Sequence, residues 1–176
     1  MYLPDKLPSV LFHTRVRDDN IEGDNPYRWE DVTTYSLFGN KECILFALPG
    51  AFTPTCSTYQ LPDFEKLYGE FKEQGIDDIY CLSVNDSFVM NKWAKDQGLQ
   101  NVKVIPDGSA KFTTKMNMLV FKDNLGFGPR SWRYAVHTKG MDIVQSFVEE
   151  GWGHNVEGDP YEQSSPQNIL TYLKGR

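Results

Sequence analysis

The sequence predicts an α/β fold in which a central mixed β-sheet is flanked by helices. Two observations predict it. Short apolar runs typical of buried strands alternate with longer segments of helical periodicity, and the chain closes with a hairpin followed by a helix. A length of 176 residues suits one domain spanning residues 1–176, and a hydrophobic content of 40% is enough for a sizeable core.

The first half of the chain contains two continuous apolar runs, at residues 43–48 and 78–84, that predict buried strands. Between them, residues 57–74 have the periodicity of an amphipathic helix. We expect Pro62 to bend this helix and Gly75 to end it. Ahead of the first run, the pattern predicts a loop at 17–27, a short strand at 29–33 and a helical turn at 34–38.

The second half continues the alternation. The predicted elements are a helix at 85–96 capped by Asp86 or Ser87, a strand at 102–105 stopped by Pro106, a helix at 109–116, a hairpin of 134–138 with 143–149, and a helix at 165–174 with Pro166 in its first position. A thioredoxin-like arrangement satisfies this order of elements, and so do other α/β sandwiches.

Composition narrows the class of protein. The formal net charge of −6 argues against a nucleic-acid partner, and no stretch is apolar enough for a membrane span or a secretory signal. The three cysteines lack CxxC spacing, which favours a reducing, cytoplasmic setting in which thiols are inert or catalytic. Three scattered histidines predict no metal site, and the acidic residues at 149–150 and 157–159 are expected in a solvated loop.

One cysteine occupies a position that suits a nucleophile. Cys56 follows the first buried strand, at the start of the helix, where backbone N–H groups and the helix dipole favour a thiolate. The common alternative is a buried cysteine that packs as a small hydrophobe. Thr53 supplies a nearby hydroxyl, and Pro49 stiffens the turn. For positive charge the best candidates are Arg130 and Arg133, the latter at the start of a predicted strand.

At these residues the chain resembles a known family. The pattern Pro49-x-x-x-Thr53-x-x-Cys56 resembles the active-site signature of the peroxiredoxins, and the string at 48–56 resembles their type II or fifth subfamily. The resemblance runs from about residue 7 to residue 174, and further matches lie at 83–86, 106–108, 125–128 and 130–134.

The resemblance implies a role for each of these residues. Cys56 is then the peroxidatic cysteine, which attacks a peroxide oxygen and becomes a sulfenic acid. Thr53 binds the peroxide, Arg133 holds the thiolate and polarises the peroxide, and Pro49 shields the site from water. Two further residues are assigned to the substrate pocket, Phe127 as lining and Arg130 behind it. No metal or organic cofactor is required.

The thiol that reduces the sulfenic acid could be Cys81 of this chain or an external thiol. Cys81 lies 25 residues after Cys56, where plant-like members have a resolving cysteine and other members a buried core residue. The loop at 151–155 contains no cysteine, so the animal-type resolving cysteine has no counterpart. An external reductant is therefore implied: glutaredoxin with glutathione, or thioredoxin. The family also implies a homodimer whose contact surface surrounds the site, including Phe52 and residues 83–88.

Two functions follow from the same cysteine. The leading hypothesis is a thiol peroxidase that acts on hydrogen peroxide and small organic hydroperoxides. The alternative is a peroxide sensor or holdase of thioredoxin-like fold that uses Cys56 without rapid turnover. A disulfide oxidoreductase is strongly disfavoured, because such an enzyme needs a second cysteine at CxxC spacing and position 59 is Tyr59.

Overall fold

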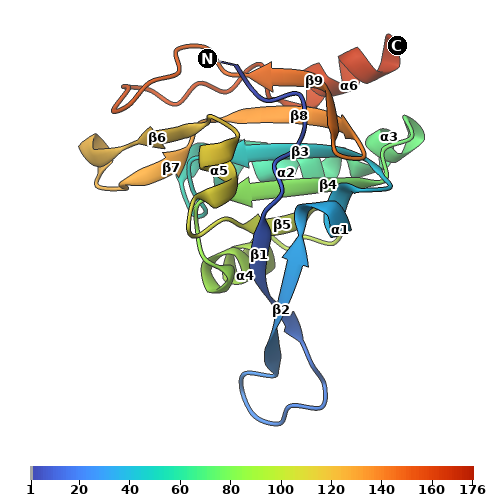
Figure 1. Cartoon of the computed structure of the whole chain (residues 1–176), viewed down its shortest axis with the longest axis vertical. Helices are drawn as coiled ribbons and strands as arrows, with labels where there is room; N and C mark the ends of the chain where they lie inside the picture. Colours follow the sequence, from blue (N-terminus) through green and yellow to red (C-terminus); the bar gives the residue numbers. More distant parts are fainter. Residues whose placement is uncertain (1) are drawn as a thin grey trace.

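The computed structural model describes residues 2–176 and is built on a five-stranded mixed sheet of order β5-β4-β3-β8-β9 (Figure 1). Three strands run parallel, and the next two along the sheet are antiparallel. The parallel strands are β3 (Glu42–Leu48), β4 (Asp78–Ser83) and β5 (Lys103–Pro106); the antiparallel pair is β8 (Tyr134–Lys139) and β9 (Asp142–Val148). Each of these five strands falls on a segment that the sequence predicts as a strand.

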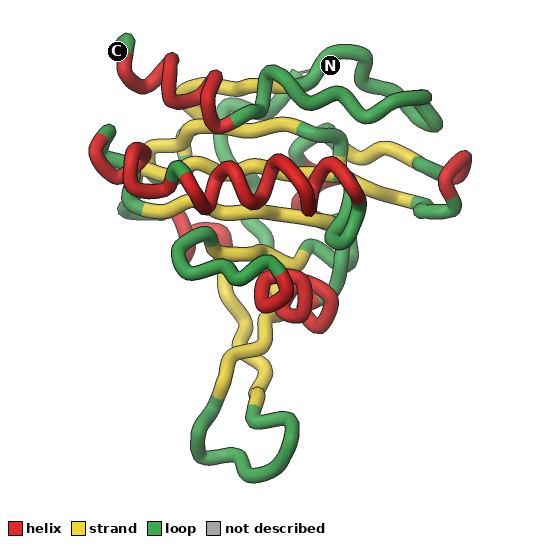
Figure 2. The backbone as a smooth tube through the Cα atoms, turned by 180° about the vertical axis from the view of Figure 1, so that it is seen from behind, coloured by secondary structure: helices red, strands yellow, loops and turns green. Residues whose placement is uncertain are grey.

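Helices cover both faces of the sheet. One face, in front in Figure 2, carries α2 (Leu61–Lys66), α3 (Tyr68–Glu73), α4 (Ser87–Asp96) and α6 (Pro166–Lys174), and the other carries α1 (Thr34–Phe38) and α5 (Lys111–Lys115). Side chains of β3 alternate between two buried clusters: Ile44 and Phe46 face α2, while Cys43 and Leu45 face α1 and α5. Phe46 stacks on Phe64 of α2 with ring centroids 4.0 Å apart. The predicted α/β sandwich is confirmed.

The helix that follows Cys56 differs from the prediction of one helix bent at Pro62. It begins with a π-helical turn, η1 (Cys56–Gln60), continues as α2, and breaks at Leu67 before α3. In the π turn, the Leu61 N–H donates to the Cys56 carbonyl. Pro62 has no N–H to donate, and the wider turn ahead of it gives its ring room, so the break falls at Leu67 instead.

Two small hairpins lie outside the central sheet. The strands β1 (Leu11–Arg17) and β2 (Tyr27–Thr33) form an antiparallel ribbon that projects away from the sheet (Figure 1). The predicted loop at 17–27 and strand at 29–33 fall on it, but β1 was not predicted. The second hairpin pairs β6 (Leu119–Phe121) with β7 (Pro129–Ser131) across the 3-10 turn η2 (Asp123–Leu125), and it was not predicted either.

Side-chain caps fix the ends of two predicted helices. The Asp86 carboxylate accepts the N–H groups of Phe88 and Val89, so Asp86 rather than Ser87 caps α4. Ser165 caps α6, and Pro166 occupies its first position. Across residues 2–176, each helix is too short or too polar to cross a bilayer.

A cluster of charges around the buried Asp78 marks the start of β4. Asp78 lies 2.7 Å from the ammonium nitrogen of Lys41 and 2.6 Å from that of Lys103. Burial alone raises the pKa of a carboxyl group, but these two ammonium groups hold the pKa of Asp78 below its usual range. The cluster therefore stabilises the ionised form of Asp78.

Candidate active site

The turn that presents Cys56 is held by its own polar groups. It runs from the end of β3 to η1, and Phe52 has the left-handed φ of 63° that the reversal requires. The Thr53 hydroxyl donates to the Gly50 carbonyl at 2.7 Å. The Ala51 N–H donates to Asn85 at 3.0 Å, which ties the turn to the carboxyl end of β4. The Cys56 side chain has no exposed surface.

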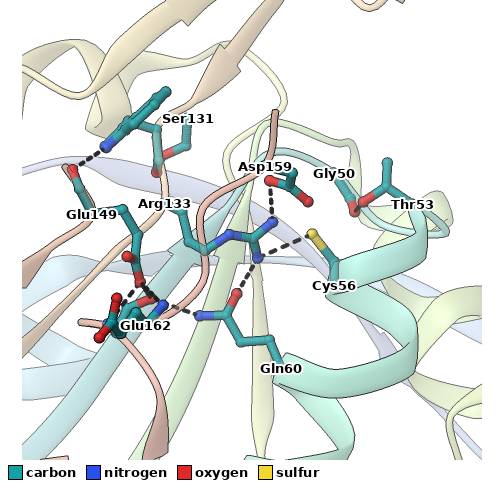
Figure 3. A network of polar contacts seen from close by, with 11 residues as sticks. Gly50, Thr53, Cys56, Gln60, Ser131, Arg133, Glu149, Asp159 and Glu162 are labelled. Atoms are coloured by element: carbon teal, nitrogen blue, oxygen red, sulfur yellow. Dashed lines mark hydrogen bonds and ion pairs between the residues drawn. The ribbon is translucent and has the colours of Figure 1, made fainter. Parts of the chain in front are cut away.

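Arg133 is brought to this turn by the sheet register. It precedes Tyr134, which pairs with Ala47 in the antiparallel β3–β8 ladder, so Arg133 lies at the end of β3 where the turn starts. Its side chain is 1% exposed. The Arg133 Nη1 lies 3.5 Å from the Cys56 sulfur, as Figure 3 shows. The two residues are 77 positions apart in sequence and in direct contact.

Two further groups bind the Arg133 guanidinium. Nη1 also donates to the side-chain oxygen of Gln60, and Nη2 lies 2.5 Å from the Asp159 carboxylate (Figure 3). Burial lowers the pKa of Arg133, but the charges of Cys56 and Asp159 outweigh it, so the pKa is raised. The guanidinium is therefore a fixed positive charge, with one nitrogen directed at the sulfur.

Glu149 corrects the sequence analysis, which expected it in a solvated loop; Glu150, Glu157 and Asp159 are exposed as expected. Glu149 is 2% exposed. Its carboxylate accepts the backbone N–H groups of Glu162, Gln163 and Ser164 at 2.9, 3.1 and 2.8 Å. Asp159 in turn pairs with Arg133. Burial of Glu149 is possible because these donors replace water around its charge.

The sequence analysis missed three residues of this network. Gln60 stands four positions after Cys56 on one helical segment, a spacing that places both on the same face and that is a usable signal. Asp159 and Glu149 carried no such signal, because their partners lie far away in sequence.

Arg130 contacts the residues around the Cys56 turn. Its Nη1 is 3.4 Å from the Pro49 carbonyl oxygen, and its guanidinium lies 5.2 Å from the centroid of the Phe127 ring. Burial lowers the pKa of Arg130, and the nearby charge of Cys56 only partly opposes it. Gly50 makes this approach possible, because a Cβ on it would lie 2.9 Å from the Arg130 Nη1. The structure thus groups Pro49, Phe127 and Arg130 beside the turn.

The other two cysteines are free thiols inside the core. Cys81 lies in the middle of β4, opposite Phe46 and Val104, and is fully buried. Burial raises the pKa of Cys81 well above its ordinary value, and the charge of Cys56 raises it further. Burial also raises the pKa of Cys43 to about 12. Both thiols are therefore held in the protonated, weakly nucleophilic form. Within residues 2–176, His, Cys, Asp and Glu side chains form no group of three suited to a metal ion.

Comparison with known proteins identifies one family. The redoxin family model matches residues 28–159. A peroxiredoxin of Rhizobium etli is 65% identical over 174 residues, which cover 99% of this chain and 97% of that protein. The hybrid peroxiredoxin hyPrx5 of Haemophilus influenzae is 48% identical, over 96% of this chain and 64% of that protein. The solved structure of a Plasmodium falciparum antioxidant protein, a 1-Cys peroxiredoxin, superposes with a TM-score of 0.90 at 40% identity, covering 98% of this chain and 99% of that one.

The sheet order, the flanking helices and this superposition define a thioredoxin-like fold, in which the turn that carries Cys56 follows the central strand β3. The chain belongs to the redoxin family and is a peroxiredoxin, close to the type II or Prx5-like group. It is therefore an enzyme of the thiol peroxidase class, with a peroxide as its substrate.

Proposed function

We propose that this chain, acting as one domain, reduces hydrogen peroxide and small organic hydroperoxides through Cys56. The observation that carries the proposal is the 3.5 Å contact between the Arg133 Nη1 and a sulfur with no exposed surface. A permanent positive charge in a water-excluded site favours the thiolate and the negative charge that develops on the peroxide. The turn holds this sulfur at the start of a helical segment, where the helix dipole adds to the effect.

The reaction is a displacement at oxygen. The thiolate attacks one oxygen, an S–O bond forms, the O–O bond breaks, and Cys56 becomes a sulfenic acid. The leaving oxygen takes the bonding electron pair and then a proton, so the product is water or an alcohol. The Thr53 hydroxyl gives its own hydrogen to Gly50, which leaves its oxygen lone pairs free to accept the peroxide O–H. Arg133 supplies the opposing donor.

The remaining site residues shape the pocket. Pro49 shields the sulfur from bulk water, and its carbonyl is held by Arg130. Phe127 lines the approach, with the Arg130 guanidinium packed on its ring. This apolar and cationic wall accommodates small peroxides and strengthens the electrostatic interactions inside the site.

We propose that an external thiol reduces the sulfenic acid. Cys81 then has a structural role, because its sulfur is buried in a central strand and its thiol is held protonated. The external thiol displaces water from the sulfenic acid to form a mixed disulfide, and a second thiol releases Cys56. Glutaredoxin with glutathione is the first candidate and thioredoxin the second; the 1-Cys description of the Plasmodium relative supports a scheme of this kind. Because Cys56 is enclosed, the η1 turn must open to admit the reductant.

Assembly and compartment belong to the same proposal. Phe52 in the active-site turn and Phe88 at the start of α4 are 52% and 54% exposed, which favours a homodimer that covers both. Sedimentation of the reduced protein tests the dimer: Phe52→Ser with Phe88→Ser is expected to give monomers, and an unchanged sedimentation coefficient would rule this surface out.

Three free cysteines favour a reducing, cytoplasmic compartment.

The test of the peroxidase assignment is peroxide loss at catalytic enzyme concentration. The assay is run in parallel with glutathione plus glutaredoxin and with thioredoxin plus its reductase. Cys56→Ser is expected to abolish turnover while its circular dichroism spectrum stays that of the wild type. Retained turnover would overturn the assignment of Cys56. Stoichiometric oxidation without turnover in either system would favour the sensor alternative.

A further inference from the structure

A chain of hydrogen bonds runs from the active-site arginine into the core (Figure 3). Arg133 Nη1 donates to Gln60 Oε1, Gln60 Nε2 donates to Ser164 Oγ at 3.3 Å, and Ser164 Oγ donates to Glu149 Oε1 at 2.7 Å. Gln60 and Ser164 have no exposed surface, and Glu149 is 2% exposed. Water therefore has no access to substitute for any member of this chain.

The hydrogen bonds in this series all run from donor to acceptor in an order that Glu149 determines. A carboxylate only accepts hydrogen bonds, so the Ser164 hydroxyl hydrogen is committed to Glu149. The Ser164 oxygen is then an acceptor for the Gln60 amide N–H₂. That orientation of the amide directs the Gln60 carbonyl oxygen to Arg133. The opposite orientation would place an N–H₂ group against a guanidinium, two donors facing each other in a dry site.

The segment that carries Ser164 holds both terminal nitrogens of the arginine. Asp159 binds Nη2 directly, while Ser164 reaches Nη1 through Gln60. Three backbone N–H groups at positions 162–164 anchor the same segment to the Glu149 carboxylate. The guanidinium plane is thereby fixed so that Nη1 lies at the sulfur.

We propose that Ser164 is a positioning residue for the oxidation of Cys56: it orients the Gln60 amide, and the amide orients Arg133. The inference rests on the proposed function of Cys56 and Arg133 and deepens it. Ser164 touches neither the sulfur nor the guanidinium in the structure, so its effect on the reaction must pass through Gln60. This dependence distinguishes a positioning role from a general contribution to folding.

A double-mutant cycle tests this dependence. The measured quantity is the second-order rate constant for Cys56 oxidation by hydrogen peroxide in a single turnover, followed by quenching and mass spectrometry of the sulfenic acid, without any reductant. Ser164→Ala is expected to lower the rate constant about 3- to 10-fold, the effect of one neutral hydrogen bond. Gln60→Met is expected to lower it by at least as much. The rate constant of the double variant is expected to equal that of Gln60→Met alone, because Ser164 acts on Arg133 only through the Gln60 amide. Gln60→Ala replaces Gln60→Met in the cycle if the latter does not fold.

Ser131→Ala is the matched control. Ser131 is also fully buried, and its hydroxyl donates to the Trp132 carbonyl without entering the chain of bonds to Gln60. Its rate constant is expected to match the wild type, while its thermal midpoint falls as much as that of Ser164→Ala. An unchanged rate in Ser164→Ala, or multiplicative losses in the double variant, would overturn the proposal. If the wild type itself forms no sulfenic acid on Cys56, the proposed function fails instead.

Discussion

Removal of the Thr53 hydroxyl isolates one contact of the proposed peroxide site. The Thr53→Val substitution keeps the shape of the side chain and removes one oxygen. In the folded protein that hydroxyl bonds only to the Gly50 carbonyl within its own turn, and Gly50 also accepts the Thr53 backbone N–H at 3.4 Å. The loss in unfolding free energy is therefore expected to stay under about 1.5 kcal/mol, the usual net value of one hydrogen bond.

The kinetic loss is expected to be larger. In the enclosed site the peroxide O–H that Thr53 accepts would have no other acceptor, and an unsatisfied polar group in such a place costs about 1–3 kcal/mol. Applied to the transition state, this predicts a fall of about 5- to 160-fold in the rate constant for Cys56 oxidation.

The assay is single-turnover oxidation by hydrogen peroxide, with thermal unfolding measured on the same samples. Thr53→Ser retains the hydroxyl and is expected to restore most of the rate. Thr58→Val removes an exposed hydroxyl from η1, the helical turn that follows Thr53, and serves as the matched control. A Thr53→Val rate within about twofold of the wild type would refute the reasoning that Thr53 binds the peroxide.

Three further substitutions test other parts of the account. Cys81→Ser is expected to leave turnover with glutaredoxin and glutathione unchanged, because the thiol is buried and protonated; loss of turnover but not of single-turnover oxidation would make Cys81 the resolving cysteine. Asp78→Asn is expected to make the free energy of unfolding less dependent on pH in the acid range. The depressed pKa of Asp78 contributes stability above its unfolded value of about 3.9, and this stability is lost as pH falls through the folded value. Urea unfolding at a series of pH values should therefore show a steeper decline for the wild type, and parallel curves would contradict this. Gly50→Ala places a Cβ 2.9 Å from the Arg130 Nη1 and is expected to slow Cys56 oxidation about 2- to 10-fold, whereas Gly69→Ala, with open space around it, is expected to leave the rate unchanged.

The sheet was predictable because its strands are continuous apolar runs. Residues 43–48 and 78–84 are apolar enough to be buried on both faces, and β3 and β4 fall on them. The ribbon strand β1 has apolar residues only at Leu11, Phe12 and Val16, and of these only Phe12 is buried, so no apolar run spans it. Its pairing with β2 satisfies its backbone instead. The break at Leu67 also had no local signal, since the sequence offered only Pro62 as a candidate.

The site was predictable where its residues share one turn or border one strand. Thr53 and Cys56 lie in the same turn, and Arg133 was identified by its place before a strand pattern. Glu149 was wrongly expected in a solvated loop, because acidic residues usually lie in water. Asp159 is exposed as expected, but its pairing with Arg133 was not predicted. The burial of Glu149 and the pairing of Asp159 depend on backbone donors and a guanidinium that only the folded chain brings near.

The most direct test of the central claim is to locate the oxidised sulfur. The reduced protein is treated with one equivalent of hydrogen peroxide in the presence of dimedone, which traps sulfenic acids, and the adduct is mapped by mass spectrometry. The account predicts an adduct on Cys56, with Cys43 and Cys81 unmodified and no adduct in Cys56→Ser. An adduct that forms on either buried thiol instead, or that survives the Cys56→Ser substitution, would contradict it.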